Sequence, residues 1–337
     1  MKTEKIVKHK IKLGKFAIAE IFLLTFLLLA QPLKAQDPHF SQWEASPVLL
    51  NPALTGMANE ADFRVNTQYR SQWGSLAPNF STVSLSADKM FGNKWGAGAV
   101  IINDDGAKAF NSFHFVFSGS YLITSPSQKQ LKLSVGIQAG IIYKSIKEDH
   151  LVFDNQYDNG IFNTDLANGE PFEKYSRLMP EVNIGMYYQG SYLENKLKPY
   201  ASFAIQHCTY PKESFLENGS SRLPLHFILA IGSAYELNKK MAVDPKLLLM
   251  KQGTAMEAML GSLFHYDYDD EVRFSTGLGY RWQDAVIFYL GCRYKNVTYR
   301  MSYDLNISPL KTYTKGKGGL EFSVQFLIGA YRQGSYL

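Results

Sequence analysis

The sequence predicts an all-β protein: a transmembrane antiparallel up-and-down β-barrel of about 14 strands with an irregular N-terminal segment. Three observations lead to this class. Segments with one apolar and one polar face recur from residue 61 onward, they run about 9–11 residues, and the long connections between them alternate with short ones. Strands of about 9–11 residues cross a bilayer when tilted, whereas strands of soluble proteins are more often about 5–6.

The closing hairpin, expected over Val297–Leu305 and Leu320–Phe326, carries the alternation most clearly. Apolar or aromatic residues occupy every second position of both strands, and Arg300, Asp304 and Glu321 lie on the intervening positions. Successive side chains of a strand point to opposite faces. Each strand therefore has one face suited to lipid and another suited to a polar lumen.

Residues 1–35 have the order of a secretory signal peptide. A lysine-rich region precedes the apolar stretch Phe16–Ala30, and Ala35 offers a small residue for cleavage before Gln36. The alternative is a membrane anchor, but the stretch is shorter than the roughly 20 residues that span a bilayer as a helix. The segment's seven lysines and two glutamates account for the whole chain's net charge of +5, so the rest of the chain is close to neutral. The basic pI is therefore no argument for nucleic-acid binding.

Residues 36–59 are expected to be irregular, because Pro38, Pro47 and Pro52 prevent a regular helix. Phe40 and Trp43 suggest that this segment packs against another part of the protein, either as a plug in the barrel or as a docking surface at its rim. The barrel itself is expected over residues 60–337.

The strands follow one another along the chain, and Pro245 lies inside the ninth, where it cannot donate a hydrogen bond to a neighbouring strand. Their expected ranges are Ala61–Arg70, Phe80–Asp88, Trp95–Ile102, Ser112–Tyr121, Leu131–Ile141, Glu181–Gln189, Lys198–His207, Pro224–Tyr235, Met241–Met250, Ala255–Phe264, Glu271–Trp282, Ala285–Lys295 and the two strands of the closing hairpin.

The parity of the connections predicts the orientation in the membrane. The long connections 147–177, 209–222 and 307–318 follow the fifth, seventh and thirteenth strands, so all three fall on the same side. Bacterial outer-membrane barrels have short periplasmic turns and longer outer loops. We therefore expect these three connections outside the cell and both termini of the barrel in the periplasm.

The opening of the exported chain resembles the PorP/SprF family of Bacteroidota. The resemblance is carried by Gln36-Asp37-Pro38-His39-Phe40-Ser41-Gln42, by Asn51, Pro52 and Gly56, by Arg70, Gln72 and Trp73, and by Tyr303 and Asp304. Leu320 departs from the family pattern, in which a histidine is expected. The resemblance implies a non-enzymatic outer-membrane component of the type IX secretion and gliding-motility machinery. It also implies roles in exporting or retaining a large adhesin, or its C-terminal sorting domain, and contacts with periplasmic type IX components, including an OmpA-like peptidoglycan-binding protein.

Other chemistry is less well supported by the sequence, and we expect no catalytic residue, cofactor or metal. The acidic stretch 154–160 lacks the residue order of an EF-hand loop. His265, Asp267, Asp269 and Asp270 could gather a metal but fall in an expected turn, where aspartate is common. His207 and Cys208 are adjacent on a strand and would point to opposite faces. Cys208 and Cys292 could form one disulfide.

The inward charges leave two functions open. Seven of them are expected to fill a hydrogen-bonded lumen: Arg64, Arg70, Arg273, Arg281, Arg300, Asp304 and Glu321. The alternative is a passive outer-membrane porin or transporter, because a barrel of this size can be open or plugged.

Overall fold

The computed structural model describes residues 37–58, 62–74, 80–125, 130–147, 150–158, 161–163, 165–166, 169–170 and 172–329. The chain forms two compact units, Met1–Asp37 and Pro38–Leu337. The expected signal peptide and Gln36 lie outside the described residues, and all helices and strands of the described residues belong to the second unit.

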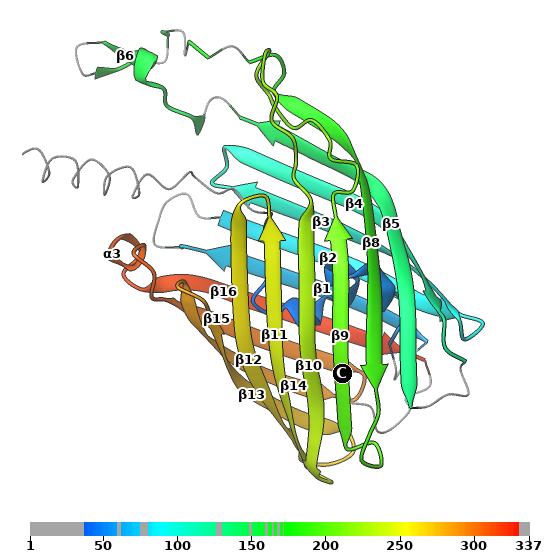
Figure 1. Ribbon diagram of the computed structural model, residues 1–337. Coiled ribbons are helices and arrows are strands. Elements are labelled where there is room, and N and C mark those ends of the chain that lie inside the picture. Colours follow the sequence, from blue (N-terminus) through cyan, green and yellow to red (C-terminus); the bar gives the residue numbers. More distant parts are fainter. Residues whose placement is uncertain are drawn as a thin grey trace, which may run out of the picture. The chain divides into compact units, whose positions relative to one another are not determined.

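The second unit contains a closed antiparallel barrel of 14 strands, each paired with its neighbours in the chain and closed by β1 against β16 (Figure 1). A separate two-residue hairpin, β6 (Tyr157–Asp158) and β7 (Ile161–Phe162), lies in the connection after β5. The barrel strands are β1 (Phe63–Gln72), β2 (Phe80–Phe91), β3 (Trp95–Gly106), β4 (Phe110–Leu122), β5 (Leu131–Ile146), β8 (Ser176–Gly190), β9 (Leu197–Gln206), β10 (His226–Asn238), β11 (Met241–Gln252), β12 (Ala255–Asp267), β13 (Val272–Arg281), β14 (Ala285–Tyr294), β15 (Val297–Asn306) and β16 (Lys317–Ile328).

The predicted fold class and strand number are confirmed. Several boundaries were wrong, because pairing continues beyond the alternating stretch. The fifth strand, expected to end at Ile141, continues to Ile146, and the next begins at Ser176 rather than Glu181. Backbone hydrogen bonding fixes a strand's end, whereas the apolar alternation extends only as far as one face meets lipid.

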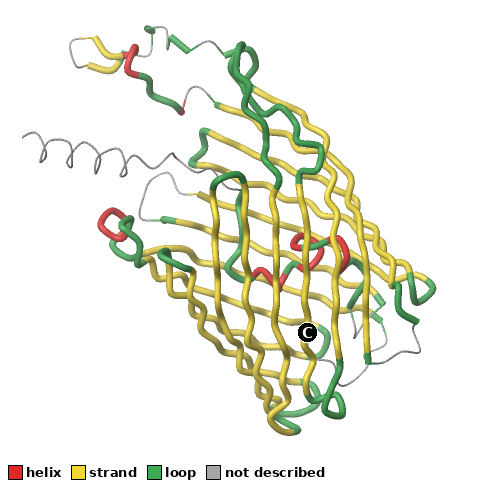
Figure 2. Tube along the Cα trace, in the orientation of Figure 1, coloured by secondary structure: helices red, strands yellow, loops and turns green. Residues whose placement is uncertain are grey.

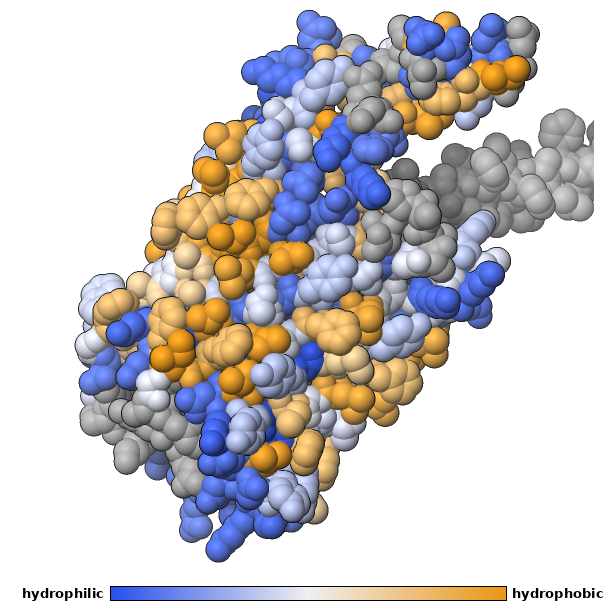
Figure 3. All heavy atoms as spheres, turned by 180° about the vertical axis from the view of Figure 1, so that it is seen from behind, coloured by the Kyte–Doolittle hydropathy of each residue, from blue (hydrophilic) through white to orange (hydrophobic). Residues whose placement is uncertain are grey.

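The two faces of the strands separate as the alternation predicts. On β1 the buried Arg64, Gln68 and Arg70 face the lumen, while Tyr69 is exposed on the outside. On β13, Phe274, Leu278 and Tyr280 are exposed, whereas Arg281 is buried. Figure 3 shows apolar side chains gathered over the middle of the barrel wall, with polar ones more frequent toward its ends. This distribution suits a wall that crosses a bilayer.

Pro245 is accommodated inside β11 rather than ending it. The β11–β12 pairing is continuous and includes Pro245 opposite Ser262. The β10–β11 ladder is interrupted there, between Gly232 opposite Lys246 and Tyr235 opposite Val243. Proline has no N–H to donate to a ladder, so the gap falls on one side of the strand only.

The connections differ between the two ends of the barrel. Those between β5 and β8, β9 and β10, and β15 and β16 are long and lie at one end, here called the long-connection end. The last of them includes the single-turn helix α3 (Lys311–Thr314). The opposite end, called the short-connection end, carries tight turns such as the one between β10 and β11. Cys208 and Cys292 are both free thiols.

The segment Pro38–Ala58 lies inside the barrel as a series of single turns, seen among the strands in Figure 2. These turns are η1 (Trp43–Ala45), α2 (Pro47–Leu50) and η2 (Pro52–Leu54), and a 3-10 turn, η4 (Asp154–Gln156), lies elsewhere in the connection after β5. Pro47 and Pro52 each begin a turn, a position where the missing N–H costs little. Among the described residues, no helix is long and apolar enough to span a membrane.

Candidate functional site in the barrel lumen

The start of the luminal segment is fixed by one carboxylate of the barrel wall. The backbone N–H groups of Ser41 and Gln42 donate to the two oxygens of Glu321, at 2.6 and 2.9 Å. The Gln42 side chain donates to Ser302 Oγ at 3.0 Å and accepts from Ser323 Oγ at 2.7 Å. Charge-assisted hydrogen bonds of this kind are roughly twice as strong as neutral ones, so β15 and β16 hold these two residues firmly.

Two arginines complete the anchor around Ser41. Arg70 on β1 forms an ion pair with Glu321 and, at 3.0 Å, with Asp304 Oδ2. Arg281 on β13 lies 3.1 Å from the same oxygen of Asp304. Ser41 Oγ donates to Asp304 at 2.7 Å and accepts from Arg70 at 2.7 Å and from Arg281. Because all five side chains are almost fully buried, each charge depends on the others for the interactions it has lost from water.

The ion-pair network continues from Arg281 to the beginning of the segment. Arg281 Nη1 donates to Asp284 at 2.9 Å, and its Nε lies 3.5 Å from Glu257. The other oxygen of Glu257 lies 3.1 Å from Nε2 of His39. The luminal segment therefore contributes residues to both ends of a continuous polar network.

A second anchor is built around Asn51. Its Nδ2 donates to Ser202 Oγ at 2.8 Å and to the carbonyls of Met186 and Phe203 at 2.9 and 3.0 Å. Its Oδ1 accepts from Ala53 N at 2.8 Å and so caps η2. Asn51 thus joins the segment to β8 and β9, on a different part of the wall from Ser41.

A third anchor holds the end of the segment at Gly56. Its N–H donates to Asp88 Oδ2 at 2.6 Å, and the same carboxylate forms an ion pair with Arg64 at 2.8 Å. Arg64 also donates to the carbonyl of Leu54 at 3.0 Å. Gly56 has φ +69°, and a Cβ there would lie 2.8 Å from Gly96 Cα. Glycine is required by both the left-handed backbone and the close approach.

Between the anchors, one lysine of the wall holds the aromatic part of the segment. Nζ of Lys246 lies 2.6 Å from Oε1 of Glu44 and 5.4 Å from the ring centre of Trp43. Burial of the Glu44 carboxyl opposes its ionisation, but Lys246 and Arg300 outweigh this effect and lower its pKa. Glu44 is therefore charged at neutral pH and forms an ion pair with the lysine.

Glycines on the inner faces of β3, β5 and β8 admit the segment's backbone. A Cβ on Gly96 would overlap the carbonyl of Thr55, one on Gly136 would overlap Pro52, and one on Gly185 would overlap Asn51. Sequence reasoning did not identify these three residues as part of the site. The available signal was glycine at polar-face positions of predicted strands, where another backbone can approach closely.

The structure brings together only some of the residues that resemble the family motif. Ser41, Gln42, Arg70 and Asp304 form one cluster, Asn51 and Pro52 contact β8, and Gly56 contacts Asp88. The remaining residues are distributed elsewhere: Phe40 is buried, Pro38 is partly buried, Gln72 and Trp73 lie where β1 ends, Tyr303 is exposed on the outer face, and Asp37 belongs to the other unit.

The possible metal ligands of the β12–β13 turn have other partners. Asp269 Oδ1 accepts from the N–H groups of Glu271 and Val272, both at 2.8 Å. Asp267 forms a two-point ion pair with Arg273, and His265 Nδ1 lies 2.8 Å from Ser275 Oγ. Nδ1 of the buried His207, directly after β9, lies 2.9 Å from Oε2 of Glu181.

The fold is similar to that of solved outer-membrane barrels. The CymD monoaromatic hydrocarbon channel shares 11% identity at a TM-score of 0.51, covering 86% of this chain and 94% of that one. The TodX deltaS2S3 mutant monoaromatic hydrocarbon channel shares 9% identity at a TM-score of 0.50, covering 83% and 93%. At such identities the likeness concerns the fold alone. No curated protein sequence matches the chain.

The sequence family is clear despite these low identities. Residues 33–326 match the family described as type IX secretion system membrane protein PorP/SprF. This match spans the luminal segment and nearly the whole barrel, and the architecture is that of an outer-membrane protein. The chain therefore belongs to the PorP/SprF family of type IX secretion membrane proteins and resides in the outer membrane.

Proposed function

We propose that this protein is a non-enzymatic accessory barrel of type IX secretion and gliding motility that supports the export or surface retention of a large adhesin. The observation that carries the proposal is the anchoring of the protein's own N-terminal segment inside the lumen. Glu321, Asn51 and Asp88 hold it at three separate places around the wall. A passive porin, the alternative function, requires a water-filled passage along the region that this segment occupies.

The two ends of the barrel offer surfaces for different partners. At the long-connection end, Tyr157, Ile161 and Phe162 are exposed, and the rings of Tyr157 and Phe162 lie 5.6 Å apart. Exposed aromatic residues are frequent in protein–protein interfaces. We assign this end to the adhesin or its C-terminal sorting domain. The short-connection end, where the luminal segment continues into β1, is assigned to periplasmic type IX components and an OmpA-like peptidoglycan-binding protein.

Deletion of residues 38–56 tests this function. The barrel closes its own hydrogen bonds, so we expect the shortened protein to assemble in the outer membrane and to remain heat-modifiable on gels. Its conductance in planar bilayers should rise, and surface display of the adhesin, measured on whole cells with an antibody, should be lost. The matched control retains residues 38–56 in scrambled order, which preserves length and composition.

The outcomes separate the accessory function from the porin. If the deletion leaves both conductance and adhesin display unchanged, the segment neither closes the lumen nor supports export. If conductance through the intact protein already equals that of the deletion variant, while adhesin display is normal in both, the passive porin is the better description.

A further inference from the structure

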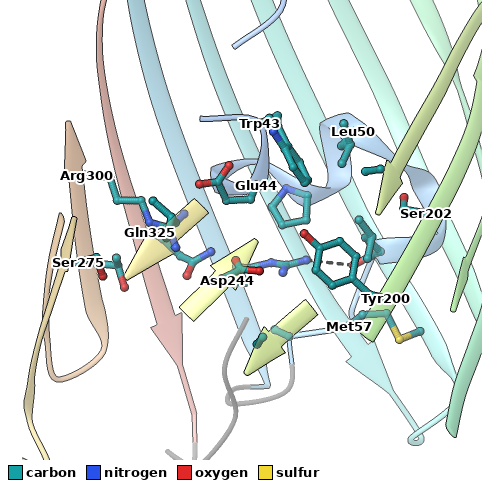
Figure 4. Close-up of a pocket in the computed structure, with 18 of the residues that line it drawn as sticks. Trp43, Glu44, Leu50, Met57, Tyr200, Ser202, Asp244, Ser275, Arg300 and Gln325 are labelled. Atoms are coloured by element: carbon teal, nitrogen blue, oxygen red, sulfur yellow. Dashed lines mark hydrogen bonds between the residues drawn. The ribbon is translucent and has the colours of Figure 1, made fainter. Parts of the chain in front are cut away.

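A cavity lies beside the luminal segment, which contributes Trp43, Glu44, Leu50 and Met57 to its lining (Figure 4). Its volume is about 140 Å³. An engineered cavity of about 150 Å³ holds a benzene molecule, so this one has room for a group the size of one amino-acid side chain. Its lining includes Arg273, Arg293 and Leu327, which lie where β13, β14 and β16 reach the short-connection end. A ligand would therefore reach it from that end.

One wall of the cavity is cationic. Arg273 pairs directly with Arg293 across β13 and β14, and Arg300 lies opposite Gly291 across β14 and β15. Nη1 of Arg300 is buried and has no hydrogen-bond partner among the described residues. A buried guanidinium N–H without a partner is costly, and a carboxylate is the group that its planar fork fits best.

The opposite wall is apolar and aromatic. Trp43 and Leu50 of the luminal segment face Tyr187 on β8 and Tyr200 on β9 across this part of the cavity. Figure 4 shows Arg300 and Ser275 on one side of the cavity and Leu50 and Tyr200 on the other, with Trp43 between them. The ligand should therefore combine an apolar body with a charged group.

The charges around the cavity favour a monoanion. With every acid counted as ionised, the lining residues and their ion-pair partners comprise five cations and four carboxylates, which leaves at least one positive charge in excess: Arg64, Arg273, Arg293, Arg300 and Lys246 against Glu44, Asp88, Asp244 and Asp267. Glu44 and Asp244 themselves line the cavity. One carboxylate would offset this charge, whereas a dianion such as phosphate would be repelled more strongly by the charged Glu44.

We propose that this cavity binds a small amphiphilic monocarboxylate. Its apolar body packs against Trp43, Tyr187 and Tyr200, and its carboxylate accepts hydrogen bonds from Arg300. The carboxylate can come from a free small molecule or from the C-terminal residue of a peptide, which present the same chemistry. This proposal is independent of the adhesin function above.

Calorimetric titration of the folded protein in detergent tests the site with phenylacetate as the probe. We expect phenylacetate to bind, and benzyl alcohol and inorganic phosphate to bind at least about tenfold more weakly, since a hydrogen bond to a charged group is worth about a factor of ten or more. A Gly-Gly-Phe peptide with a free C-terminus, compared with its C-terminal amide, tests the peptide source. If only phenylacetate binds, the ligand is a small molecule.

Two variants keep the test decisive. Arg300→Gln should weaken phenylacetate binding at least about tenfold. The control Arg177→Gln, at the long-connection end, removes a charge that pairs with Glu173 and should leave binding unchanged. Ala234→Phe fills the apolar part of the cavity while keeping Arg300, and it should abolish binding. Equal binding of phenylacetate and benzyl alcohol, or binding that survives both cavity variants, would overturn the proposal.

Discussion

At the scale of single residues, the lumen shows how buried charge is tolerated. Glu321 and Asp304 lie within the wall, where an isolated carboxylate would be strongly destabilised. Each accepts charge-assisted hydrogen bonds from Arg70, and Asp304 also pairs with Arg281. Because the barrel's charges are satisfied partly by Ser41 and Gln42, the segment contributes to the stability of the wall as well as being held by it.

Arg70→Met should therefore be strongly destabilising. Removing one member of a buried ion-pair network costs about 3–5 kcal/mol, because the partners remain buried without their charge. Urea unfolding of the detergent-folded protein measures the change. The control Arg177→Met breaks a more exposed pair with Glu173, which should cost about 1 kcal/mol or less.

A double variant checks the cause of the Arg70 effect. In Arg70→Met with Glu321→Gln, the unpaired carboxylate is gone, so part of the lost stability should return. If the double variant is as unstable as the sum of the two single variants, the ion pair is not responsible, since contacting residues should show coupling.

The sequence predicted whether a strand residue faces the lumen or the outside of the barrel, but it did not predict which residues contact it. Alternation placed Arg70, Asp304 and Glu321 on the inner face correctly. It gives no information on how deep a non-strand segment lies in the lumen, so it could not place Ser41 among them. Ser41, Asn51 and Gly56 were singled out only through the resemblance to a family.

At the scale of elements, the luminal segment is a series of turns that packs closely against glycines of the barrel wall. Pro47 and Pro52 set the start of two turns, and Gly96, Gly136 and Gly185 provide space for the backbone between them. These glycines lie within paired strands, where they add no side-chain packing of their own. Their placement therefore serves the segment rather than the sheet.

Gly185→Val should displace the luminal segment while leaving the barrel closed. The new side chain would overlap Asn51, and overpacking of a well-packed interior typically costs about 1–3 kcal/mol. Limited proteolysis of the folded protein should then cut within residues 38–58, with the heat-modifiable barrel band retained.

The control for this experiment is Gly119→Val. A Cβ at Gly119 meets no atom closer than 3.9 Å, so the segment should stay as protected as in the natural protein. Equal protection of the segment in both variants would mean that the space left by Gly185 does not determine the position of the segment.

The fourteen barrel strands were predictable, because so many strands with one apolar and one polar face are compatible with few folds other than a membrane barrel. The small hairpin β6–β7 and the turns of the luminal segment were not predicted. Two-residue strands are too short to show a period, and single turns begun by proline carry no apolar stripe. Local sequence patterns identify only elements long enough to bury one face along their length.

At the scale of the whole barrel, the uneven connections predict its orientation. Cysteines placed at Glu217 and Tyr313, both exposed at the long-connection end, should react on intact cells with a membrane-impermeant thiol reagent. A cysteine at Lys239, exposed in the turn after β10, should react only after the cells are lysed. The background requires Cys208→Ser and Cys292→Ser, since Cys208 is itself exposed.

Labelling at Lys239 but not at Tyr313 on intact cells would reverse the orientation. The assignment of adhesin and periplasmic partners to the two ends would reverse with it. The fold and the luminal network would be unaffected, because both are independent of which end faces the medium.

The position of the luminal segment also constrains the order in which contacts form during folding. Ser41 leaves the ribosome early, yet its partners Asp304 and Glu321 lie 263 and 280 residues later in the chain. Contacts between such distant residues form late, because closing the intervening loop is entropically costly. Ser41 and Gln42 must therefore wait for these partners until the last hairpin has joined the first strand. Until then the closed lumen in which Phe40 and Trp43 are buried has not formed. Any factor that protects these two side chains must therefore act before β16 pairs with β1.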